Sequence, residues 1–209
     1  MKFIIEIPAE PASAVADATD AEALLIGRAE GFTSAPLPRA LPHPPIYQRI
    51  TGGDFEFEGG SEHAAGFAID LADGQPDLDR ASAILRVEEA KSGRGDRITS
   101  LIAFLFPDLA SLADRGHGLV GSPRLFALAY DEARMQSQLP SGEPLHPAPL
   151  VYARARSVGE ARKLACPVYL KPLWSGDNAQ NRAIIAQAKA DGFDGLISPP
   201  VMAALIRNA

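Results

Sequence analysis

The stretch that decides the fold is residues 150–199, LVYARARSVGEARKLACPVYLKPLWSGDNAQNRAIIAQAKADGFDGLISP. A helical pattern over 150–165 is followed by the short apolar run 168–170. A second helical pattern, over 177–190, precedes the apolar run 196–197. Asp177 is a favourable N-cap for the second helix, and Gly192 suits the turn after it. Helices that alternate with short, continuous apolar strands are typical of a parallel sheet buried on both faces.

The same alternation extends along the whole chain. A helix is predicted over 77–91, and Ser198 with Pro199 is expected to cap a last helix that ends at Arg207. Eight strands that alternate with helices predict an α/β fold, a compact (β/α)8 barrel of the TIM type. Such barrels usually have about 250 residues, so trimmed helices are expected, especially between 28 and 65. The eight predicted strands are 3–7, 23–26, 46–50, 67–71, 98–106, 125–130, 168–170 and 196–197.

Three assignments leave alternatives open. An open doubly wound sheet is the rival architecture. Residues 124–138, preceded by Ser122-Pro123, are compatible with a capped helix, but a strand over 125–130 completes the set of eight. Ser157 and Glu160 are spaced like a capping box, which a helix already running from Leu150 would make incidental.

The Pro-rich stretches 36–45 and 140–149 are expected to be neither helix nor central strand, because proline removes a backbone donor. They are either domain linkers or long loops of one domain, and the even spread of apolar segments favours loops.

Composition and charge exclude several classes of function. The 209 residues, 46% hydrophobic and 22% charged, suit one globular domain over residues 1–209. A net charge of −6 without any Lys/Arg run argues against nucleic acid and acidic lipid as partners. No apolar stretch approaches the roughly 20 residues that cross a bilayer. A single cysteine, Cys166, excludes an internal disulfide and fits a reducing compartment. We therefore expect a cytoplasmic protein without nucleic-acid or membrane partners.

The histidines give no metal-binding pattern. None of the four lies at helical or CxxC-like ligand spacing from another, so a zinc site is not predicted. They are His43, His63, His117 and His146.

Several motifs in residues 150–199 resemble the citrate lyase β-subunit and 2-oxo-acid aldolase family. Tyr152-Ala153-Arg154 with the later Ala161-Arg162 resembles its "YAR…AR" helix. The run Gly192-Phe193-Asp194-Gly195 resembles its "GFdGK" turn, and Ile197-Ser198-Pro199 stands where the family has "IHP". Weaker similarity extends upstream, to the family's "RLaALlfG", "vRiN" and "LfvPA" strands at residues 124–130, 47–51 and 3–9.

This resemblance implies a (β/α)8 barrel that is commonly a homo-oligomer. It also implies carbon–carbon bond cleavage or formation on acyl-CoA or 2-oxo-acid substrates, assisted by Mg²⁺. In such chemistry the metal and an arginine stabilise the negative charge that develops on an enolate or carbonyl oxygen. A small anionic or CoA-type ligand is thus the expected partner.

The sequence departs from the family at the metal ligands. The position of the first ligand, a Glu, falls on Phe106, and that of the second, an Asp, falls on Arg134. Phenylalanine removes a ligand and arginine adds a positive charge where the cation would bind, so the sequence predicts neither a Mg²⁺ site nor another cofactor. Nearby carboxylates that could substitute are Asp108, Asp131 and Glu132.

Five residues are candidates for substrate binding. Arg49 matches the substrate-contacting arginine of "vRiN", although a salt-bridged arginine is the simpler alternative. Arg134 either replaces the metal charge or is a solvated helix residue. Asp70 ends the fourth strand, and Lys171 and Trp174 follow the seventh, at the barrel end where sites form.

Two functions remain at this stage. The first is a lyase with an altered, metal-independent site. The second is a non-catalytic homologue that uses the barrel for small-anion or CoA binding, or for assembly. The missing metal ligands favour the second function, and the resemblance favours the first.

Overall fold

The computed structural model describes residues 1–7, 21–27, 44–50, 65–91, 99–113, 118–139 and 148–208. The four histidines lie outside these residues. So do most of the two Pro-rich stretches and most of the segment between 28 and 65, in which trimmed helices are expected.

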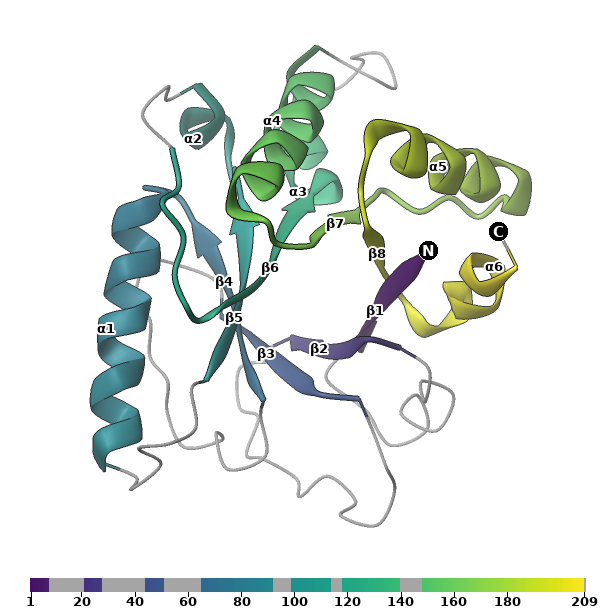
Figure 1. Ribbon diagram of the computed structural model, residues 1–209. Coiled ribbons are helices and arrows are strands. Elements are labelled where there is room, and N and C mark those ends of the chain that lie inside the picture. The colour runs from purple at the N-terminus through teal and green to yellow at the C-terminus, as the bar shows by residue number, and fades with distance from the viewer. Residues whose placement is uncertain are drawn as a thin grey trace.

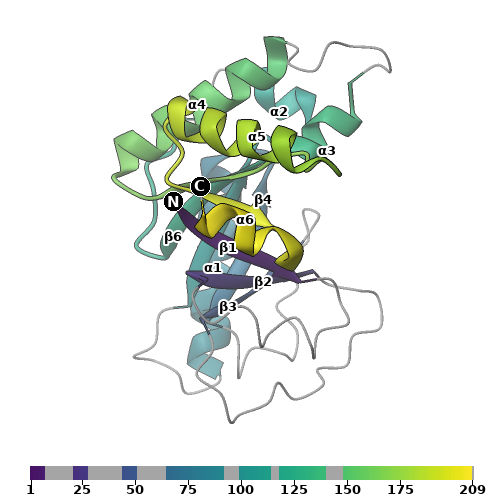
Figure 2. The same cartoon turned by 90° about the vertical axis from the view of Figure 1, so that its right-hand side faces the viewer.

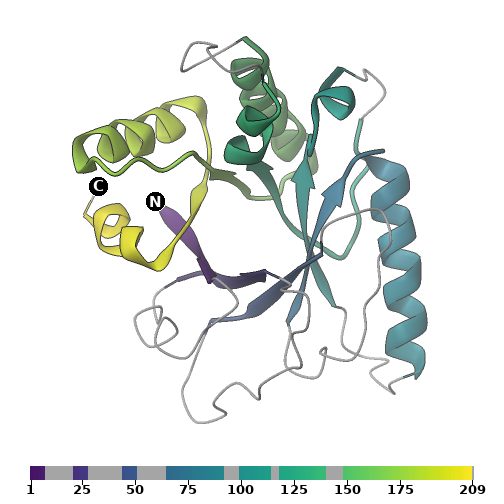
Figure 3. The ribbon, with the colours of Figure 1, turned by 180° about the vertical axis from the view of Figure 1, so that it is seen from behind.

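Eight parallel strands form a closed barrel in which each strand pairs with its neighbours in sequence and the first pairs with the last (Figure 1; seen from behind in Figure 3). This confirms the predicted α/β barrel and excludes the open doubly wound sheet. It also confirms a strand at 125–130. The strands are β1 (Lys2–Ile7), β2 (Ala23–Gly27), β3 (Ile46–Ile50), β4 (Gly66–Leu71), β5 (Ser100–Leu105), β6 (Leu125–Asp131), β7 (Val168–Lys171) and β8 (Gly195–Ser198).

The three long helices lie around the outside of the barrel, as Figures 1 and 2 show. The other helices are reduced to one or two turns, as expected of so short a barrel. No helix in the described ranges is both long and apolar enough to cross a membrane. The helices are α1 (Gln75–Lys91), α2 (Leu109–Ala113), α3 (Glu132–Ser137), α4 (Ala148–Leu164), α5 (Asn178–Asp191), the 3₁₀ helix η1 (Pro200–Met202) and α6 (Ala203–Arg207).

The predicted ends of α5 are confirmed. The carboxylate of Asp177 accepts a hydrogen bond from the Ala179 amide at 2.9 Å, and Gly192 is left-handed with φ of 93°. The predicted cap at Ser198 is wrong. Ser198 is the last residue of β8, and the following 3₁₀ helix begins at Pro200, with Pro199 at the N-cap and no side-chain cap. Pairing of β8 with β1 keeps Ser198 extended, so its hydroxyl cannot serve the next helix.

Two details of α4 differ from the simplest interpretation of its sequence. Pro149 belongs to the helix rather than to the preceding loop. It lies in the first turn, where a missing amide proton costs nothing. Ser157 is an interior helix residue whose hydroxyl donates to the Ala153 carbonyl at 2.8 Å, so the capping-box spacing is incidental.

Side chains alternate along each strand between two separate cores. The outer core lies between the sheet and the helices and includes residues from both. The inner core consists of strand residues alone and fills the barrel, as the two-residue period of a strand requires. Its buried members are Ile4, Ala23, Leu25, Tyr47, Ala68, Ile102, Phe104, Ala127, Ala129, Tyr169 and Ile197.

Two glycines make room for the tyrosines of the inner core. A Cβ on Gly195 would meet the ring of Tyr169, with the Cδ1 atom at 2.6 Å. A Cβ on Gly66 would lie 2.7 Å from Cε1 of Tyr47 and still closer to the Ser100 carbonyl oxygen. The large rings therefore fit inside the barrel only because the facing positions have no side chain.

We predict that Gly66→Ala lowers the free energy of unfolding by about 2 kcal/mol, because overpacking forces neighbouring atoms to move. Gly159→Ala is the matched control, since its Cβ would meet nothing within 4 Å on helix α4. It should stabilise the protein by about 0.5–1 kcal/mol through helix propensity. Urea unfolding measures both changes. Equal stabilities of the two variants would contradict this packing.

Candidate functional site

Charged side chains gather inside the barrel at the carboxyl ends of five strands. Each of these residues follows an inner-core residue of its strand by two positions. The two-residue period of a strand therefore points its side chain into the barrel. This is the end at which the sites of such barrels form. Together with Arg134 of α3, these residues form what we call the mouth cluster: Glu6 (β1), Arg49 (β3), Asp70 (β4), Asp131 (β6), Lys171 (β7) and Arg134.

Arg49 is the buried centre of the mouth cluster, with a side chain only 8% exposed. Its guanidinium donates to Asp131 Oδ2 at 2.9 Å and to Asp70 Oδ1 at 3.4 Å, and it lies 3.8 Å from Glu6 Oε1. The guanidinium carbon also stacks 4.0 Å from the centre of the Phe104 ring. Both expectations for Arg49 thus meet in one place: it is salt-bridged, and it lies at the barrel mouth.

Asp131 joins two cations through a single oxygen. Its Oδ2 accepts from Arg49 and lies 3.2 Å from the Lys171 ammonium, while its Oδ1 accepts from the Arg134 amide at 3.0 Å. Burial raises the pKa of Asp131, but Lys171 and Arg49 outweigh burial and hold the pKa below its usual range. Asp131 is therefore ionised at neutral pH.

The upper part of the mouth cluster reaches solvent. The Arg134 side chain is 37% exposed and its Nη1 pairs with Asp70 Oδ2. The Lys171 ammonium lies 2.9 Å from the Glu6 carboxylate, and these two side chains are 22% and 26% exposed. Arg134 is thus paired across the barrel rather than simply solvated. Two cations and one carboxylate face outward above the buried residues.

Trp174 is placed differently from the other candidates. Its indole nitrogen donates to the Ile197 carbonyl at 3.3 Å, and the ring packs against the outer core. The structure therefore brings together Arg49, Asp70, Arg134 and Lys171, and it places Trp174 beside β8. Glu6 was not singled out in the sequence, although its position two residues after the apolar Ile4 is the same signal that the other strands carry.

The residues that the structure describes at the mouth do not fit Mg²⁺. Phe106 is buried, with the Arg156 guanidinium 4.8 Å from its ring centre. The carboxylate oxygens of Asp70 and Asp131 already accept from the cluster cations or from a backbone amide. Among the residues that the structure describes, no three His, Cys, Asp or Glu side chains converge as metal ligands.

Two carboxylates considered as substitute ligands have other roles. Asp108 directly precedes α2, and its Oδ1 accepts from the Ser111 amide in the first turn of that helix at 2.7 Å. Glu132 is held by Arg154, whose Nη2 lies 2.8 and 2.7 Å from its two oxygens. Arg154 also donates to Asp191 at 2.8 Å. This network ties the start of α3 to α4 and α5, and so fixes the helix that carries Arg134.

Comparison with solved structures finds several proteins of similar fold. RipC from Yersinia pestis matches with a TM-score of 0.66 and 17% identity, over 100% of this chain and 94% of that one. A Haloferax volcanii malate synthase in a magnesium/glyoxylate complex matches at 0.71 and 17%, over 98% and 74%. CitE from Mycobacterium tuberculosis, in complex with magnesium, acetoacetate and coenzyme A, matches at 0.61 and 15%, over 99% and 79%.

These structural neighbours are of the citrate lyase β-subunit and aldolase type, so the resemblance noted in the sequence is confirmed at the level of the fold. No protein-family model and no curated protein matches the sequence.

We predict that Arg49→Met destabilises the protein by about 3 kcal/mol, because it leaves two buried carboxylates with reduced compensation. Arg134→Met is the control. Its side chain is half-exposed, so the loss should stay below about 1 kcal/mol. Chemical denaturation at neutral pH compares the two. A cost for Arg49→Met no larger than that for the control would mean that Arg49 is not the centre of charge pairing.

Proposed function

We propose that the mouth cluster binds the carboxylate of a small 2-oxo acid, and that the chain catalyses carbon–carbon bond cleavage or formation without a divalent metal. The observation that carries this proposal is the position of Arg134 and Lys171 on the accessible side of the barrel mouth, above the buried Arg49.

Each cation suits a different part of such a substrate. A guanidinium is planar and pairs with a carboxylate through two parallel hydrogen bonds, so Arg134 is suited to the acid group. The substrate carboxylate would compete with Asp70 for this guanidinium. Lys171 then lies where the 2-oxo oxygen would bind. Fixed positive charges stabilise negative charge that develops on that oxygen, which is the task of a metal in related chemistry.

The ligands named for the structural neighbours support this substrate class. The malate synthase structures are complexes with glyoxylate and with pyruvate and acetyl-CoA, and CitE is a complex with acetoacetate and coenzyme A. All three small molecules carry a carboxylate and a carbonyl group. A CoA thioester is the corresponding second substrate here. One domain over residues 1–209, a cytoplasmic location and homo-oligomeric assembly belong to the same proposal.

A second candidate function is non-catalytic binding of the same small anions. One observation favours it: each carboxylate of the mouth cluster contacts a cation, so an unpaired general base is missing from the described part of the mouth. Turnover separates the two candidates. Pyruvate released from a 4-hydroxy-2-oxo acid supports a lyase, and binding of that compound without release supports the second candidate.

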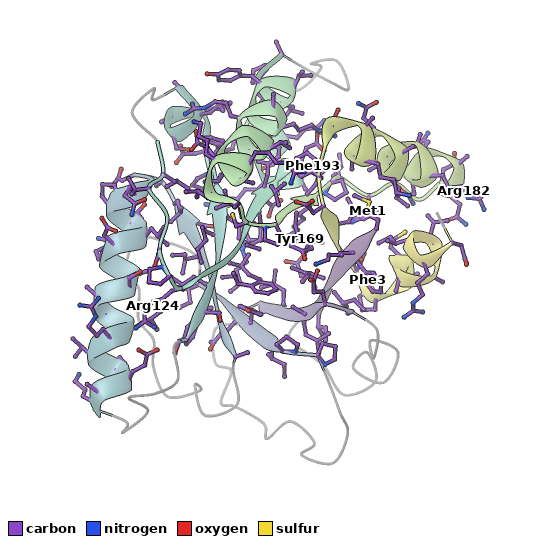
Figure 4. All side chains as sticks on the ribbon, in the orientation of Figure 1. Met1, Phe3, Arg124, Tyr169, Arg182 and Phe193 are labelled. Atoms are coloured by element: carbon purple, nitrogen blue, oxygen red, sulfur yellow. The ribbon has the colours of Figure 1, made fainter. Side chains whose placement is uncertain are left out.

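We predict that pyruvate and other 2-oxo acids raise the melting temperature equally with Mg²⁺ and with a chelator, since a ligand that binds the native state stabilises it. Arg134→Gln should weaken pyruvate binding about tenfold through loss of a charge-assisted hydrogen bond. Arg182→Gln is the control, because Arg182 is an exposed residue of α5 that takes no part in the mouth cluster (labelled in Figure 4). A shift that requires Mg²⁺, or one that Arg134→Gln leaves unchanged, would refute the proposed site.

A further inference from the structure

We infer that Lys171 is the catalytic nucleophile of this barrel, and that it forms a Schiff base with the carbonyl carbon of a 2-oxo acid. This inference rests on the proposed function and adds to it a covalent step. Lysine amines form Schiff bases with carbonyl substrates, and the iminium that results withdraws electrons from the adjacent carbon.

A nucleophilic lysine must point into the substrate site and be reachable from solvent, and Lys171 meets both requirements. It is the last residue of β7, two residues beyond the inner-core residue Tyr169, so its side chain points into the barrel at the carboxyl end. The side chain is 22% exposed, which leaves it partly shielded but reachable from solvent. Other lysines, such as Lys91 and Lys163, are exposed on outer helices, and among the described residues each pairs there with a single glutamate.

Two carboxylates are placed to handle the protons of this step. Glu6 lies 2.9 Å and Asp131 3.2 Å from the Lys171 ammonium. Glu6 is the more exposed of the two, and it can accept a proton from the ammonium and return it to the departing oxygen. Asp131 Oδ2 is shared between the Arg49 guanidinium and the Lys171 ammonium, so Asp131 holds the lysine side chain in place while Glu6 takes the proton.

The step balances in atoms and charge. The ammonium gives one proton to Glu6, and the free amine adds to the carbonyl carbon, so that a C–N bond forms while the carbonyl π electrons move to oxygen. A second proton passes from nitrogen to that oxygen and gives a neutral carbinolamine. The proton held by Glu6 then reaches the hydroxyl group, which leaves as water, and the nitrogen lone pair forms the C=N bond. An ammonium and a ketone have become an iminium and water.

The net charge on the Lys171 nitrogen is the same before and after the reaction, so the same carboxylates can stabilise both the ammonium and the iminium. The iminium carries the same single positive charge as the ammonium, so the ion pairs with Glu6 and Asp131 persist. When the bond between C3 and C4 of a 4-hydroxy-2-oxo acid breaks, its electrons move into a C2–C3 double bond and the C=N π electrons move to nitrogen. The 4-hydroxyl proton goes to Glu6, which is a carboxylate again once water has left, as the aldehyde departs. That proton then moves to C3 of the enamine, and water hydrolyses the resulting iminium to pyruvate and the lysine ammonium. The iminium is the electron sink, so the step needs no metal.

The test is reductive trapping on the intact chain. Pyruvate with cyanoborohydride should convert the iminium to a stable secondary amine, in which hydride has added to the former carbonyl carbon. Intact-mass measurement and peptide mapping should then find one reduced pyruvate on Lys171. Lys171→Arg keeps the charge and the contacts with carboxylates, and it should abolish this adduct. Lys163→Arg, on the outer face of α4, should leave it unchanged.

Two results would overturn the inference. One is pyruvate labelling that falls equally on Lys163 and other exposed lysines, since a positioned amine should react about tenfold or more faster than a free one. The other is absence of an adduct at Lys171 while pyruvate still raises the melting temperature, which leaves the proposed binding function standing. If pyruvate neither shifts the melting temperature nor forms the adduct, the proposed function fails together with the Schiff base.

Discussion

The shared oxygen of Asp131 is the contact on which the barrel mouth depends. It brings the Arg49 guanidinium and the Lys171 ammonium to the same point, from strands on different sides of the barrel. Two cations this close would repel one another without the carboxylate between them. Arg49 is then free to hold Asp70, which in turn orients Arg134. The mouth cluster, as far as the structure describes it, balances three cations with three carboxylates, so a bound anion would exchange places with a carboxylate rather than add to the cluster.

Much of the fold could be predicted because it follows from local patterns. Continuous apolar strands that alternate with helices require two cores, and a closed barrel provides both. The ends of α5 also follow from local signals, at Asp177 and Gly192. The predicted cap at Ser198 failed because a distant strand, β1, holds that residue extended. A local cap signal competes poorly with strand pairing.

The candidate site was less predictable because its contacts are long-range. Arg49 could be named from its strand, but its burial depends on partners 21 and 82 residues away. Glu6 carried the same two-residue signal as the other cluster residues and was passed over. The motif residues that carry the family resemblance prove to be structural: Arg154 binds Glu132 and Asp191, and Gly192 ends a helix. The recognisable pattern is thus carried by residues that build the barrel rather than by residues of the mouth cluster.

The two inner-core tyrosines beneath the mouth cluster, Tyr47 and Tyr169, determine from which end of the barrel a ligand can reach that cluster. Tyr47 and Tyr169 are almost fully buried, and the Tyr169 hydroxyl bonds to Glu22 near the amino ends of the strands (Tyr169 in Figure 4). Burial and this carboxylate raise the pKa of Tyr169, so its hydroxyl keeps its proton. Together with the other inner-core side chains, the two rings fill the barrel below the mouth cluster and block passage of water and solutes along the barrel axis. A ligand bound above these rings is therefore reached from the carboxyl ends of the strands and not along the barrel axis.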